Sequence, residues 1–149
     1  MDQTHIHLIT NHIPVIGSFF GIFVLIYGMI MHSYPIIKAA YYIFIICAVG
    51  AAVTFWTGEA AEETIERMGG ISEAVIEKHE DSAGIALLSM IILGSASIGA
   101  LLYPFYQSSF SKLLSYIILA IALISFGITV NTSRLGGNIR HTEIVNNQP

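Results

Sequence analysis

The sequence predicts an all-α integral membrane protein, a four-helix bundle whose second and third spans continue as helices beyond the membrane. Two observations lead to this fold class. Of the 149 residues, 54% are hydrophobic and only 11% are charged, whereas about 25% of a soluble domain is charged. Four runs without Asp, Glu, Lys or Arg are each long enough to cross a membrane, which takes about 20 residues. This composition excludes a soluble enzyme, a disordered chain and a basic nucleic-acid binder.

The four spans are expected at about 13–31, 36–56, 83–104 and 113–131, within a single domain, 1–149. Each should be a helix, because backbone polar groups in hydrocarbon must be paired within the segment. The short connections after the first and third spans predict two helical hairpins. The segment before the first span has no Lys or Arg, unlike a signal peptide, so we expect it to stay in the mature protein. The single cysteine, Cys47, excludes a disulfide framework.

Charge is segregated between the two ends of this predicted bundle. Four spans bring both termini and the loop 57–82 to one end, the acidic end, which carries every acidic residue: Asp2, Glu59, Glu62, Glu63, Glu66, Glu73, Glu77, Glu80, Asp81 and Glu143. Four basic residues accompany these ten acids, so the net charge there is −6 with His neutral. The other end, the basic end, has Lys38 and Lys112 and no acid. The positive-inside rule favours a cytoplasmic basic end and a periplasmic acidic end in a bacterial inner membrane.

The acidic loop 57–82 reads as two helical pieces that extend the second and third spans. Glu59, Glu62, Glu63 and Glu66 share one helix face. Gly69-Gly70 ends that piece, and Ser72 can cap the next one, with Glu73 in its first turn. The four glutamates are either a solvated face or a surface that meets Arg134, Arg140 or a metal ion, because like charges at this spacing repel.

Five of the six histidines lie at the acidic end: His5, His7, His12, His79 and His141. His12 begins the first span, where either Asn11 caps the helix or Pro14 kinks a helix that starts near Thr4. His79 enters the third span at a similar depth. Ionisable groups at such a depth are costly and point to a functional site. Imidazole binds haem iron and metal ions, so His12 and His79 are the best candidate ligands; the alternative is an interfacial histidine bonded to water or to a headgroup.

Glycine patterns in the first and fourth spans have two interpretations each. Gly17 and Gly21 form a G-x-x-x-G motif, which indicates close helix packing or a groove for a flat macrocycle. Gly136-Gly137 is expected to end the fourth helix, or to let Arg140 and His141 fold back over the mouth of the bundle.

These motifs resemble a bacterial family of small four-span membrane proteins known mainly as a domain of unknown function. The resemblance covers roughly residues 5–143 and rests on His7-x4-His12-x-Pro14, on His79, and on Leu135-Gly136-Gly137 followed by Arg140-His141. The segments 57–63 and His79-Glu80 resemble a signature of one branch. The chain departs from the pattern at Leu8, where many relatives have Pro, and in a shorter spacing from Gly-Gly to His. Some relatives are joined to Rieske-type iron–sulfur domains, so the resemblance implies a haem-b or other redox membrane protein.

Three functions follow from these observations. The first is a cytochrome b-like electron-transfer protein with b-type haem between His12 and His79. In this hypothesis His7 and His141 form a second ligand pair or support the first. Arg134 and Arg140 would lie near the haem propionates. A quinone or a periplasmic carrier would exchange electrons with the haem. The second is a zinc, iron or manganese site, with ligands drawn from His7, His12, His79, His141, Glu59, Glu63 and Glu80. The third is a non-catalytic subunit of a membrane complex or a homo-oligomer. The lipid membrane is an expected partner in all three.

Overall fold

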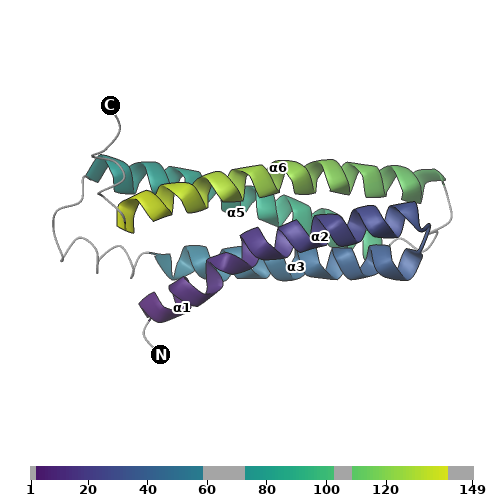
Figure 1. Cartoon of the computed structure of the whole chain (residues 1–149), viewed down its shortest axis with the longest axis horizontal. Helices are drawn as coiled ribbons and strands as arrows, with labels where there is room; N and C mark the ends of the chain where they lie inside the picture. Colours follow the sequence, from purple (N-terminus) through teal and green to yellow (C-terminus); the bar gives the residue numbers. More distant parts are fainter. Residues whose placement is uncertain (1–2, 59–72, 103–108, 141–149) are drawn as a thin grey trace.

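The computed structural model describes residues 3–58, 73–102 and 109–140, and within these ranges it is helical and contains no strand. The helices are α1 (Gln3–Thr10), α2 (His12–Ile30), α3 (Tyr34–Trp56), α5 (Glu73–Leu102) and α6 (Ser109–Arg140) (Figure 1). The last four are long and apolar enough to cross a membrane. The prediction of an all-α four-helix membrane bundle is confirmed.

The bundle consists of two hairpins packed side by side. One hairpin is α2 with α3 and the other is α5 with α6; α3 also packs on α5, and α2 on α6. Helix α1 continues α2 in one oblique line and crosses α3, which it contacts (Figure 1). The start of α1, the end of α3, the start of α5 and the end of α6 therefore lie together, at the acidic end. The basic end holds the turn from α2 to α3 and the start of α6.

Glycines of α2 let this helix approach α3 closely. A Cβ added at Gly17 would lie 2.5 Å from the sulfur of Cys47, and one at Gly21 would lie 2.5 Å from the ring of Phe44. At Gly28 it would lie 2.9 Å from the backbone nitrogen of Ile37. Small residues at a helix interface allow such contact in membranes. The packing interpretation of the G-x-x-x-G motif is confirmed, because α3 fills the space that a macrocycle would need.

The interior is apolar with a few hydroxyl groups, while the outer surface is covered with large apolar side chains. The largest fully buried side chains among the described residues are those of Phe44, Leu25, Met90, Leu93 and Ile118. Outward-facing apolar residues cover much of the bundle, and Trp56 is 84% exposed. In water such a surface would be an aggregation hazard, but in hydrocarbon it is the expected exterior.

Hydroxyl groups link the helices across the interior. The Tyr41 hydroxyl lies 2.8 Å from Ser115 Oγ and so joins α3 to α6. Ser125 Oγ of α6 donates to the Ser89 carbonyl oxygen of α5 at 3.2 Å. Interhelical hydrogen bonds in membranes contribute about 0.6 kcal/mol on average, so these bonds fix the register of the helices more than they stabilise the fold.

Two expected helix ends differ in the structure. Asn11 makes no side-chain capping bond and has helical backbone angles; the helix already begins at Gln3, which agrees with the alternative in which Pro14 lies inside a longer, interrupted helix. The expectation that Gly136-Gly137 ends the fourth helix is wrong, because α6 continues to Arg140. Neighbouring contacts override the low helix propensity of glycine.

The helical extension of the third span is confirmed, since α5 begins at Glu73 rather than at Ala83. α3 ends at Trp56, where Thr57 closes the last turn through its backbone N–H. The expected extension of the second span, with its four glutamates, Gly69-Gly70 and the cap Ser72, lies in 59–72, outside the described residues.

Candidate functional site at the acidic end

His7 is half-buried on α1 and has one ring nitrogen fixed by the neighbouring helix. Its Nδ1 lies 2.9 Å from the carbonyl oxygen of Thr54 on α3. A carbonyl oxygen only accepts, so Nδ1 must carry the hydrogen, and Nε2 of the neutral ring keeps its lone pair free. Ligating histidines commonly show this arrangement, in which a backbone carbonyl sets the tautomer and orientation of the ring.

His79 is half-buried on α5 and packs against α6. Its buried Nδ1 has no partner among the described residues. The ring rests on Gly136, where an added Cβ would lie 2.9 Å from His79 Cε1. The absent side chain at Gly136 therefore makes room for the imidazole, which explains a glycine in the middle of a helix.

The two imidazoles lie close enough to interact electrostatically. They come from different hairpins: α1 and α3 hold His7, while α5 and α6 hold His79. Two further buried oxygens on the first hairpin, Asn11 Oδ1 and Thr54 Oγ1, also lack partners among the described residues. Asn11 stands four residues after His7, so both belong to one side of the N-terminal segment. Leaving a buried polar group unpaired costs about 1–3 kcal/mol, so these three atoms carry a cost that a hydrogen-bonding partner would relieve.

The two histidines predicted to act together, His12 and His79, are not brought together among the described residues. His12 is exposed on α2, and the histidine that interacts with His79 is His7. The reason is the helical N-terminal segment: five residues of helix separate the directions of His7 and His12 by about 140°, so only one of them can point into the bundle.

The remaining candidate residues are less involved in this pair. Arg134 of α6 and Glu80 of α5 are exposed, although Glu80 interacts electrostatically with His79. Arg140 is the last residue of α6, and His5 lies in α1. Glu59, Glu63 and His141 lie outside the described residues. Within the described residues, no three His, Cys, Asp or Glu side chains form a group that could hold a metal ion.

Sequence reasoning missed the supporting roles of Thr54 and Gly136. A signal for Gly136 exists in the fourth span, where Ser125, Thr129, Thr132 and Gly136 recur at intervals of four, three and four residues. That spacing marks one face of a helix, and Thr129, Ser125 and Thr132 indeed form hydrogen bonds on it.

Comparison of the chain with family models, with curated proteins and with solved structures finds no match. The resemblance to small four-span redox proteins therefore stays a prediction.

Proposed function

We propose that this protein transfers electrons in the membrane with b-type haem held at the acidic end by His7 and His79. The observation that carries the proposal is the matched state of the two rings. Each ring is held by the helix beside its own, His7 through the Thr54 carbonyl and His79 against Gly136, and His79 Nδ1 has no partner among the described residues. Bundle helices that present two such imidazoles suit haem, which needs no covalent attachment motif.

The number of ligands favours haem over a bare metal ion. Zinc sites use three or four protein ligands, whereas a porphyrin already supplies four nitrogens and leaves two axial positions for the protein. The described residues offer the pair and no third ligand beside it. A zinc, iron or manganese ion is the second candidate, and the electrostatic interaction of Glu80 with His79 favours it.

The residues of the chain would divide the work as follows. His7 and His79 would hold the iron, with the His7 ring oriented by the Thr54 carbonyl and the His79 ring seated on Gly136. Arg134, exposed near the end of α6, can pair with a propionate. Bound haem supplies a one-electron couple. The excess of acids at this end attracts a cationic carrier, and a quinone is the membrane alternative. We place this end at the periplasmic face of a bacterial inner membrane, because Lys38 and Lys112 occupy the opposite short connections.

The test is the absorption spectrum of protein purified from a host that makes haem. We expect a reduced-minus-oxidised α-band that disappears in His7→Ala and in His79→Ala, and that returns when imidazole is added to either variant. His12→Ala, at an exposed position, is the matched control and should keep the band. Colourless wild-type protein overturns the proposal, and so does a band that is lost in His12→Ala but kept in His7→Ala. Elemental analysis of a colourless preparation that finds stoichiometric zinc, iron or manganese would favour the second candidate.

A further inference from the structure

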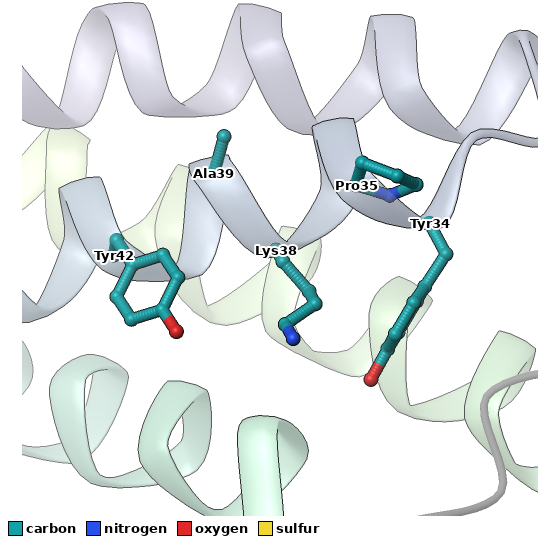
Figure 2. A pocket seen from close by; sticks show the side chains of 5 residues that line it. All are labelled: Tyr34, Pro35, Lys38, Ala39 and Tyr42. Carbon is teal, nitrogen blue, oxygen red and sulfur yellow. The ribbon is translucent and has the colours of Figure 1, made fainter.

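We propose that the basic end binds the phosphate headgroup of an anionic phospholipid at Lys38. A groove of about 370 Å³ opens there, lined by Tyr34, Pro35, Lys38, Ala39 and Tyr42 of α3. Tyr34, Lys38 and Tyr42 stand at intervals of four residues and project from the same side of the helix, with their polar atoms pointing the same way (Figure 2). The groove thus places the Lys38 ammonium group between two tyrosine side chains, and Pro35 and Ala39 of the same helix complete its lining.

The charge of Lys38 requires a counterion that the chain does not supply nearby. The sequence has no Asp or Glu from residue 3 to 58 or from 82 to 142. The acids at the start of α5 are at the opposite end of that helix of 30 residues, which is about 45 Å long. The Lys38 Nζ lies 5.5 Å from the centre of the Tyr34 ring, a contact that orients an ammonium group without neutralising it. An anion from outside the chain is the complementary partner.

The depth of Lys38 identifies a lipid as the source of that anion. α3 has 23 residues and is about 35 Å long, slightly longer than a hydrocarbon core of about 30 Å. Lys38 is one turn inside its start, where a lysine extends its ammonium group to the level of the headgroups. Tyrosines concentrate at this same boundary, and Tyr42 is 55% exposed toward the space that lipid would occupy.

The test compares lipids on the full-length protein in a neutral detergent. Native mass spectrometry counts molecules of dioleoyl phosphatidylglycerol or dioleoyl phosphatidylcholine that stay bound, and inorganic phosphate is added in a third arm. We expect one retained phosphatidylglycerol, with affinity about five- to tenfold weaker in Lys38→Gln and unchanged in Lys38→Arg. Lys112→Gln is the matched control, since it removes the same charge at the same end from an exposed position outside the groove; its affinity should change less than about twofold.

Four results would overturn this proposal. Equal weakening in Lys38→Gln and Lys112→Gln would mean diffuse attraction to the basic end. Equal retention of phosphatidylcholine would mean that the negative charge is not recognised, and displacement of the lipid by millimolar phosphate would indicate a site for free phosphate. Tyr42→Phe gives a second readout that removes only a hydroxyl group; an unchanged affinity in both Tyr42→Phe and Lys38→Gln would also exclude the groove.

Discussion

Buried polar atoms are treated differently in the middle of the bundle and at its acidic end. In the middle, every buried hydroxyl residue among those the structure describes has a hydrogen bond, namely Ser18, Tyr41, Ser97, Ser115, Ser125 and Thr129. At the acidic end, Asn11 Oδ1, Thr54 Oγ1 and His79 Nδ1 have no partner among the described residues. The middle therefore uses its buried polar groups in helix packing, whereas three buried polar atoms at the acidic end lack such a partner among the described residues.

The largest effect is expected from breaking the packing of the middle. Gly21→Leu would place side-chain atoms where Phe44 already lies, only 2.5 Å from the position of the new Cβ. Overpacking of this kind costs about 1–3 kcal/mol or more, and α2 should separate from α3. The matched control is Gly99→Leu, since nothing lies within 4 Å of a Cβ at that position. Thermal unfolding in detergent measures both, and equal stability of the two variants would contradict the described packing.

A ligand-specific effect is expected at neighbouring glycines of α6. Gly136→Ala pushes a methyl group against the His79 ring, whereas at Gly137 nothing lies within 4 Å of an added Cβ. We expect Gly136→Ala to weaken haem binding by about 10- to 100-fold, as loss of the support of a ligand does. Gly137→Ala should leave binding unchanged and raise stability by up to about 1 kcal/mol. Absorbance titration with haem gives the affinities; a larger loss in Gly137→Ala would refute the role given to Gly136.

The smallest effect is expected from removing a buried hydroxyl group that is unbonded at the acidic end or hydrogen-bonded in the middle. Thr54→Val removes a buried oxygen with no partner in the described parts of the chain and should raise the free energy of unfolding by about 0.5–1 kcal/mol. The Thr54 carbonyl still accepts from His7, so the ring stays oriented. Thr129→Val deletes a bonded hydroxyl, 2.9 Å from the Ser125 carbonyl, and should lower stability by a similar amount. If unfolding in detergent shows the same sign for both variants, the distinction between middle and end is wrong.

The fold could be predicted from the sequence because lipid imposes a simple requirement on it. Charge-free runs of about 20 residues have to be helices, and the even number of runs puts both termini at one end. The extension of α5 to Glu73 followed from the absence of a helix breaker after Ser72. Helix ends were less predictable, since Asn11 and Gly136 carry terminus signals that contacts with other helices override.

The site could be predicted only in part. The gathering of histidines at one end was visible in the sequence, and His79 was correctly placed where its helix enters the bundle. The interaction of His7 with His79 was not predicted, because the sequence left open whether the helix begins near Thr4 or at Asn11 and paired His79 with His12. Only a helical N-terminal segment that crosses α3 brings His7 to the Thr54 carbonyl, and that crossing depends on the direction of the chain through Asn11 and Pro14.

The origin of the two histidine rings in separate hairpins has a mechanical consequence. His7 is anchored on the pair that contains α3, and His79 rests on α6 of the other pair. Any group bound by both rings would cross-link the two hairpins at the acidic end, which is opposite the short connections that close each hairpin. By mass action such a group would stabilise the assembled bundle by about 2.7 kcal/mol at a hundredfold excess over its dissociation constant. Loss of the group would loosen one half from the other without unfolding either.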